Sequence, residues 1–324
     1  MAKEIKNILV TGSVGQIGSE LTMALRERYG AQNVIATGRK TAPSAQLRDS
    51  GPFHFIDVAK RESVLEIVDK YKVDTIVHMA AILSAAGEKN PQLAWDVNMN
   101  GLYNILEVAR EREMARVIVP SSIAVFGKGC PADDTPQETV LKPTTMYGVT
   151  KVAGELLGDY YVRRFHVDCR GLRYPGIISS ETLPGGGTTD YAVEIFYEAI
   201  RHKRYTCFLK ADTGLPMMYM PDCLKATVDL MVAPFEKLEH HCDFNVGAFS
   251  VTPAKLAAEI KKHIPEFTIA YEPDFRQAIA DSWPNSLDDS AARKEWGWKP
   301  AFDLAAMTKD MLEKLGKRHK EGKL

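Results

Sequence analysis

The residues with the clearest chemical potential are a tyrosine and a lysine one helical turn apart. Tyr147 and Lys151 enclose the segment Gly-Val-Thr, and side chains at this spacing share one face of a helix. An ammonium beside a phenol stabilises the phenolate and lowers the phenol pKa, as a general base for an alcohol requires. Ser122 follows a predicted strand upstream, where its hydroxyl would hold a substrate oxygen against Tyr147. Together they predict removal of a proton from an alcohol.

A glycine-rich turn near the start of the chain predicts a dinucleotide site. Gly12, Gly15 and Gly18 lie between an apolar strand and an amphipathic helix. Without side chains, such a turn lets backbone N–H groups and the helix N-terminus approach a pyrophosphate. We expect Gln16 and Ile17, in the same turn, to contact the dinucleotide as well.

The end of the second predicted strand bears on which dinucleotide is bound. The acidic residue that holds the adenosine ribose of NAD usually stands there, whereas this chain has Gly38, Arg39 and Lys40. Arg39 would stack on adenine or pair with a 2′-phosphate; alternatively, both cations are exposed loop residues. Asp57, after the third strand, would accept from the adenine amino group or cap the next helix. These residues leave the choice between NAD and NADP open.

Alternating strands and helices must position these residues. Strands are predicted at 8–10, 34–37, 53–56, 75–79 and 116–119, and helices at 62–71 and 92–112. This alternation predicts an α/β fold with a doubly wound parallel sheet. It ends near Tyr174, so 1–174 with part of 216–250 is assigned to a dinucleotide-binding domain, and 175–215 with 251–324 to a smaller substrate-binding region. The loop at 184–187 would be a hinge or a static turn.

Composition excludes several classes of protein. The 324 residues are 45% hydrophobic, and 41 basic side chains nearly balance 42 acidic ones, so neither disorder nor binding to nucleic acid or anionic membranes is expected. The five cysteines have no paired spacing, which predicts no metal site and a soluble protein in a reducing compartment, cytoplasmic or, in a eukaryote, the mitochondrial matrix. The start leaves no room for a presequence. A basic cluster that includes Arg318 is predicted to be a solvated helix end.

With these motifs in this order, the chain resembles the extended short-chain dehydrogenase/reductase family over nearly its full length. The resemblance implies a Rossmann fold and the catalytic triad Ser122, Tyr147 and Lys151. Most members act on nucleotide sugars, so a 4-epimerase or dehydratase of this fold is the alternative function. A non-catalytic cofactor-binding protein would not need the triad. The cofactor-binding residues predicted from the motifs and this resemblance are Gly12, Gly15, Gln16, Ile17, Gly18, Arg39, Asp57, Val58, Met79, Ala80, Ala81, Asn98, Tyr147, Lys151 and Tyr174.

Within that family, four segments resemble the L-threonine 3-dehydrogenases of the short-chain type. They are residues 78–85, 120–127, 185–191 and 281–284. This resemblance implies NAD-dependent oxidation of the C3 hydroxyl of L-threonine to 2-amino-3-oxobutanoate, a step of threonine catabolism. It also implies a homodimer joined through the helices that bear residues 98–112 and 147–164. The chain departs from these enzymes at Gly38 and Arg39, where they commonly carry Asp, so NAD is expected and NADP stays open.

A zwitterionic amino acid needs donors for its carboxylate, an acceptor for its ammonium and a base at its hydroxyl. Asp190 would face or order the ammonium, although residues 188–190 also suit the N-cap of the next helix. Trp283 is expected to pack rather than bind, and His78 to be a satisfied core histidine. No metal is required, because a phenolate replaces the Lewis acid. The implied substrate-binding residues are Ser84, Ser122, Tyr147, Gly187, Thr188, Thr189 and Asp190.

Overall fold

A parallel six-stranded sheet forms the centre of the computed structural model, which describes residues 4–183 and 185–324. Residues 1–3, at the start of the chain, and Pro184, in the predicted loop at 184–187, lie outside the described residues. The strand order is β3-β2-β1-β4-β5-β7, and every neighbouring pair is parallel. The predicted doubly wound α/β fold is confirmed. The strands are β1 (Ile8–Thr11), β2 (Val34–Gly38), β3 (Phe53–Phe55), β4 (Thr75–His78), β5 (Arg116–Ile118) and β7 (Cys169–Arg170).

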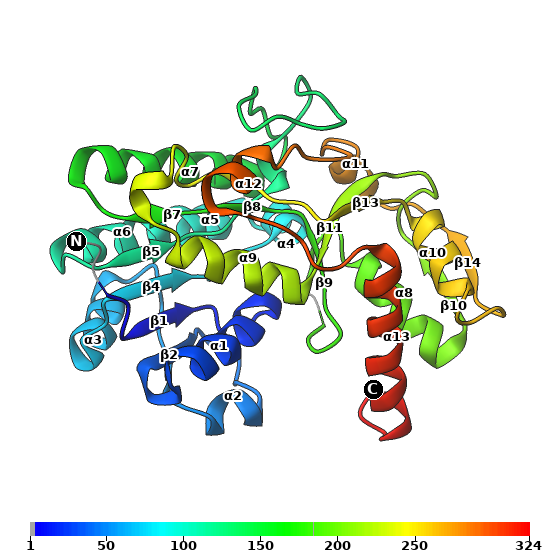
Figure 1. The fold of residues 1–324 in the computed structure, drawn as a ribbon, viewed down its shortest axis with the longest axis horizontal. Helices are drawn as coiled ribbons and strands as arrows, with labels where there is room; N and C mark the ends of the chain where they lie inside the picture. Colours follow the sequence, from blue (N-terminus) through cyan, green and yellow to red (C-terminus); the bar gives the residue numbers. More distant parts are fainter. Residues whose placement is uncertain (1–3, 184) are drawn as a thin grey trace.

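Helices cover both faces of this sheet (Figure 1). Successive strand residues point to opposite faces, so Leu9 packs under α3, α6 and α7, whereas Ile8 and Val10 pack against α1 and α9. The strand ends therefore open between two helical layers, where ligands bind in such folds. The helices of these layers are α1 (Gln16–Tyr29), α2 (Ala45–Asp49), α3 (Arg61–Tyr71), α4 (Ser84–Lys89), α5 (Pro91–Trp95), α6 (Gly101–Glu111), α7 (Met146–Phe165) and α9 (Met220–Val232).

Two local features differ from the sequence prediction. The single helix predicted at 92–112 is α5, then a π-helical turn at Asp96–Asn100, then α6; the turn contains Asn98. Ser121 and Ser122 do not merely follow β5 but form a strand of their own, β6 (Ser121–Ser122). It pairs with β8 (Leu172–Tyr174), which also pairs with β12 (Phe244–Asn245). This pairing fixes the backbone that carries Ser122.

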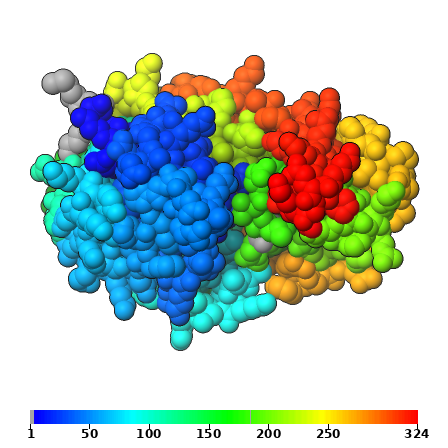
Figure 2. Space-filling view, turned by 90° about the horizontal axis from the view of Figure 1, so that it is seen from below, coloured from blue at the N-terminus to red at the C-terminus, as the bar shows by residue number. Residues whose placement is uncertain are grey.

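A second group of elements lies at the other end of the molecule from α3 (Figure 1). Its core is a separate apolar cluster that joins α8, α10 and α13 to short sheets. In Figure 2, N-terminal residues form one side of the face seen from below, and α13 with its neighbours forms the other. Its elements are β9 (Gly176–Ile178), α8 (Tyr191–His202), β10 (Arg204–Cys207), β11 (Leu215–Tyr219), β13 (Phe249–Val251), α10 (Pro253–Lys261), β14 (Thr268–Tyr271), α11 (Arg276–Ala280) and α13 (Leu304–Lys320). Helix α12 (Ser290–Trp296) instead packs in the cluster that contains β12. Short 3-10 turns elsewhere span Ala31–Asn33, Ile123–Val125 and Phe235–Lys237.

Neither a membrane span nor a metal cluster is found in the part of the chain that the structure describes. No helix there is both long and apolar enough to cross a bilayer. No group of three or more His, Cys, Asp or Glu side chains there is arranged to hold a metal ion. Cys169 and Cys207 are fully buried, as expected of small core residues.

Candidate active site

The three glycines of the first turn have different roles. Gly12 has a φ of +67°, and a Cβ there would lie 2.7 Å from the Ala80 nitrogen. A Cβ on Gly18 would lie 2.3 Å from the Gly12 oxygen, so both positions exclude a side chain for reasons of packing. Gly15 is instead the N-cap of α1, which has no acidic residue in its first turn. The free N–H groups of this helix end favour an anion such as a pyrophosphate.

A cleft of two adjoining cavities runs past this turn. The adenosine-end cavity has a volume of about 330 Å³ and the catalytic-end cavity about 380 Å³. Four residues line both cavities and join them: Gly15, Met79, Ala81 and Ile82. The predicted cofactor residues Gly12, Arg39, Asp57, Val58 and Ala80 line the adenosine end, and Gln16, Ile17, Tyr147, Lys151 and Tyr174 line the catalytic end. Two adjoining cavities that meet at a helix N-terminus suit an extended dinucleotide.

The adenosine end carries an ion pair at its rim. The Arg39 Nε lies 3.6 Å from the Asp57 Oδ2, and the Arg39 side chain is 47% exposed. The other Asp57 oxygen accepts a hydrogen bond from the Ala59 N–H at 3.2 Å. Helix α3 begins after Lys60, so the alternative role of Asp57 as a helix cap is wrong. Asp57 faces the cavity instead.

Tyr147 lies in the first turn of α7. Thr145 caps this helix by accepting from the Gly148 N–H at 3.0 Å, which fixes where the turn begins. Desolvation raises the pKa of the Tyr147 phenol to about 12, and a hydrogen bond with the Ser122 hydroxyl opposes that rise. Ser122 also accepts from the Ala124 N–H at 3.2 Å. Both side chains line the catalytic-end cavity, and the predicted role of Ser122 in holding a substrate oxygen stays a prediction.

Lys151 lies one turn further along α7, with its ammonium 5.5 Å from the centroid of the Tyr147 ring. The ammonium donates to the Pro120 carbonyl at 2.6 Å. Desolvation lowers the pKa of Lys151 to about 8, and the Glu155 carboxylate opposes this change. The predicted lowering of the Tyr147 pKa by Lys151 is wrong for the protein alone. Desolvation dominates, and the ammonium bonds to a carbonyl rather than to the phenol.

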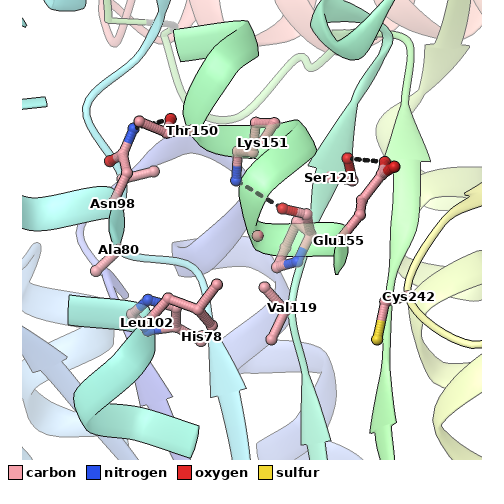
Figure 3. A pocket seen from close by; sticks show the side chains of 13 residues that line it. His78, Ala80, Asn98, Leu102, Val119, Ser121, Thr150, Lys151, Glu155 and Cys242 are labelled. Atoms are coloured by element: carbon pink, nitrogen blue, oxygen red, sulfur yellow. Dashed lines mark hydrogen bonds between the residues drawn. The ribbon is translucent and has the colours of Figure 1, made fainter. Parts of the chain in front are cut away.

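Behind Lys151 lies a charged network that the sequence analysis missed. A small cavity of about 20 Å³ lies there. Lys151, Ser121 and Glu155 are among the side chains around it (Figure 3). Both Glu155 oxygens accept from the Arg173 guanidinium at 2.9 Å, and Ser121 also donates to Glu155. The pair is nearly inaccessible to solvent, and Asp243 adds a second carboxylate 3.5 Å from Arg173. The spacing of Lys151 and Glu155 could have revealed part of this network, because the two residues lie one turn apart on the same helix face.

Asn98 is held entirely by the protein. Its Oδ1 accepts from the Ile82 N–H at 2.8 Å, and its Nδ2 donates to the Ile82 carbonyl and to the Thr150 hydroxyl, each at 3.1 Å. Figure 3 shows it beside α7 at the same small cavity. Asn98 therefore ties the segment after β4 to the helix that carries Tyr147. Its predicted cofactor contact stays a prediction.

His78 is a buried core histidine, as predicted. Its Nδ1 lies 2.9 Å from the Thr11 hydroxyl oxygen, which also accepts from the Ala80 N–H at 3.2 Å. Desolvation, with a smaller effect of Lys151, lowers the pKa of His78 to about 3. The ring is neutral at physiological pH and fixes the turn after β4.

The far wall of the catalytic end comes from the segment before α8. The hydroxyl oxygens of Ser84 and Thr188 lie 3.3 Å apart, and both side chains are buried. Asp190 accepts from the N–H groups of Gly186 and Gly187 at 3.0 and 2.8 Å, while burial raises its pKa to about 6. Asp190 stands at the N-cap position of α8, as the alternative predicted, but its side chain makes no capping bond. Thr189 packs against Gly176, because a Cβ on Gly176 would lie 2.9 Å from the Thr189 Cβ.

Other predicted residues border the catalytic end in different ways. The Tyr174 hydroxyl is hydrogen-bonded to the Thr227 hydroxyl, and the predicted contact of Tyr174 with the cofactor stays a prediction. The Gln16 Nε2 lies 3.5 Å from the Thr182 carbonyl, and Trp283 lines the cavity while packing on two apolar clusters. Arg318 donates to the Ser180 and Glu181 carbonyls, so the predicted solvated helix end is wrong for this residue.

Comparisons with known proteins agree on one family. The model of the NAD dependent epimerase/dehydratase family matches residues 8–247. An uncharacterized epimerase/dehydratase of Staphylococcus haemolyticus is 52% identical, with 95% of this chain and 97% of that protein covered. The structure of L-threonine dehydrogenase from Clostridium difficile is 54% identical, with a TM-score of 0.95 and 98% and 99% covered. A monomeric L-threonine 3-dehydrogenase from a metagenome is 46% identical, with a TM-score of 0.92 and 96% and 99% covered.

Proposed function

Because this chain belongs to the NAD-dependent epimerase/dehydratase family, we propose that it is an oxidoreductase that converts L-threonine to 2-amino-3-oxobutanoate with NAD. The resemblance to the extended short-chain dehydrogenases is confirmed at family level. The observation that carries the proposal is the catalytic-end cavity, where Ser122 and Tyr147 face a wall of small polar residues. The similarity to L-threonine dehydrogenases over nearly the whole chain supports it.

In the proposed reaction, Tyr147 removes the proton of the threonine side-chain hydroxyl. A bound nicotinamide supplies the acceptor for the hydride that leaves C3. Ser122 orients the substrate oxygen, since its side chain lines the same cavity as the Tyr147 phenol. Lys151 supplies a positive charge one turn away, and its ammonium must turn from the Pro120 carbonyl to stabilise the phenolate.

The amino-acid end of threonine would meet the wall built by Ser84 and Thr188. Their hydroxyls are buried and point to each other, so together they offer a donor to a carboxylate. Asp190 orders the glycine loop through two N–H bonds, and one of its oxygens has no such bond. That oxygen would be the acceptor on the ammonium side.

The alternative, a nucleotide-sugar epimerase or dehydratase, needs a cationic group for a second pyrophosphate. Among the described residues that line the catalytic end, Lys151 is the one lysine or arginine, and it is assigned to Tyr147. This composition favours a small zwitterion over a nucleotide sugar.

A substrate panel tests the proposal. The protein is incubated with NAD or NADP and either L-threonine or a set of UDP-sugars, and reduced nicotinamide is followed by absorbance. We expect absorbance to grow with L-threonine alone. Turnover of a UDP-sugar without turnover of L-threonine would instead establish the alternative.

We also propose a homodimer joined through α5, α6 and α7. Five large apolar side chains are exposed along these helices: Trp95, Tyr103, Val149, Leu156 and Tyr160. A second copy is the occupant that the family resemblance implies, and a two-fold axis would pair this face with itself. Sedimentation should show a dimer that Leu156→Glu dissociates and that Val232→Glu, an exposed apolar site on α9, leaves intact. A monomeric wild-type protein would overturn this proposal.

The cysteines support a reducing compartment. All five are free, and Cys130 alone is not buried. Since no disulfide stabilises the fold, we infer a cytoplasmic location.

A further inference from the structure

The end of β2 offers no carboxylate to an adenosine ribose. The Thr37 hydroxyl is buried and donates to the Val10 carbonyl at 3.0 Å, so it faces the sheet. Gly38 has no side chain, and a Cβ there would lie 3.1 Å from a Val14 methyl and 3.3 Å from Phe53. The carboxylate that commonly binds the ribose hydroxyls of NAD is thus missing, and Val14 and Phe53 crowd its position.

The charges at this end favour an additional anion. The charged residues among those that line the adenosine-end cavity are Arg39, Lys40 and Asp57. Asp57 is already engaged by Arg39 and by the Ala59 N–H. One carboxylate therefore faces two cations, and the rim keeps a net positive charge.

Arg39 is placed to supply a guanidinium fork. The ion pair with Asp57 reaches its Nε, and no described residue accepts a hydrogen bond from its two terminal nitrogens. The side chain is half exposed, so it can turn towards a phosphate without leaving a buried site. A planar guanidinium matches two phosphate oxygens at once, which an ammonium does not.

We propose that the adenosine end of the cleft binds a 2′-phosphate through Arg39 and Lys40, so that the protein takes NADP at least as tightly as NAD. This inference rests on the proposed dinucleotide site but not on threonine as the substrate. It assigns Arg39 the selection of the dinucleotide.

Calorimetric titration of the full chain with NADPH and NADH, without threonine, tests the inference. We expect NADPH to bind at least as tightly as NADH in the wild type. Arg39→Ala should weaken NADPH about tenfold to hundredfold, because hydrogen bonds to a charged group are lost, while NADH changes far less. Arg48→Ala is the matched control, since it removes another exposed Arg–Asp pair on the same segment but outside the cleft.

The opposite change sharpens the test. Gly38→Asp combined with Val14→Ala supplies the missing carboxylate and room for it, and should shift selectivity towards NADH. The inference is overturned if the wild type binds NADPH more weakly than NADH, or if Arg39→Ala weakens both equally. If neither dinucleotide binds, this inference and the proposed function are both overturned. If the protein binds NADPH as expected but does not oxidise L-threonine, the 2′-phosphate site stands and only the proposed substrate is wrong.

Discussion

The two ends of the cleft are built on different physical principles. At the adenosine end, backbone N–H groups and a solvent-exposed ion pair present charge at the surface. At the catalytic end, half-buried Tyr147 and Lys151 have strongly shifted pKa values, and a buried pair of Glu155 and Arg173 lies behind them. Selectivity at the first end can therefore change by single surface substitutions. Chemistry at the second depends on a network that folding must complete.

The largest effect is expected at the catalytic end, in Tyr147→Phe. Removal of the phenol hydroxyl eliminates the general base, so kcat for threonine oxidation should fall about 10²–10⁴-fold. Binding of the dinucleotide should change little, because the ring remains. Steady-state kinetics and calorimetry on the same preparation check both statements. Unaltered turnover would remove Tyr147 from the mechanism.

The buried pair behind Lys151 should matter for folding more than any exposed pair. Glu155→Gln leaves Arg173 charged with reduced compensation inside the protein, which should cost about 3–5 kcal/mol of unfolding free energy. Urea denaturation measures this cost. The control is Glu313→Gln, which removes an exposed partner of Lys309 and should cost about 0.5 kcal/mol or less. Equal costs would contradict the contrast between buried and exposed charge.

Glu20 on α1 should make stability depend on pH. It accepts a hydrogen bond from Ser179, and burial raises its pKa from 4.5 to about 7. Below pH 4.5 both folded and unfolded states are protonated; between 4.5 and 7 the unfolded state ionises first, so stability falls as pH rises. Above pH 7 the full cost is present, on the order of 3 kcal/mol.

Glu20→Gln removes this cost and retains an oxygen that accepts from Ser179. The variant should match the wild type below pH 4.5 and gain stability over it as pH rises to 7. Thermal denaturation at a series of pH values shows the trend. A constant difference between the two proteins at every pH would contradict the assignment to Glu20.

The smallest effect on the free energy of unfolding is expected at the adenosine end. Arg39→Ala breaks an exposed ion pair, so the free energy of unfolding should change by about 1 kcal/mol or less. Urea denaturation of this variant beside Glu155→Gln compares the two ends directly. A loss as large as that of Glu155→Gln would show that the rim is part of the folded core.

The sequence predicted the local motifs well and the long-range contacts poorly. The alternation of strands and helices, the glycine turn and the Tyr147–Lys151 helix are each encoded by residues that lie near one another in the sequence. Glu155 binds Arg173 from a different element, and Asp190 binds a loop rather than its own helix. Such contacts depend on how strands and loops meet, which periodicity does not encode. The roles of the site residues remain predictions that the variants test.

The most direct test of the central claim follows the hydrogen on C3 of the substrate. The protein is incubated with L-threonine deuterated at C3 and an oxidised nicotinamide dinucleotide, and the reduced dinucleotide is analysed by mass spectrometry. We predict one deuterium in the reduced nicotinamide and formation of 2-amino-3-oxobutanoate. Reduced dinucleotide without deuterium, or no reduction with L-threonine at all, would contradict the account.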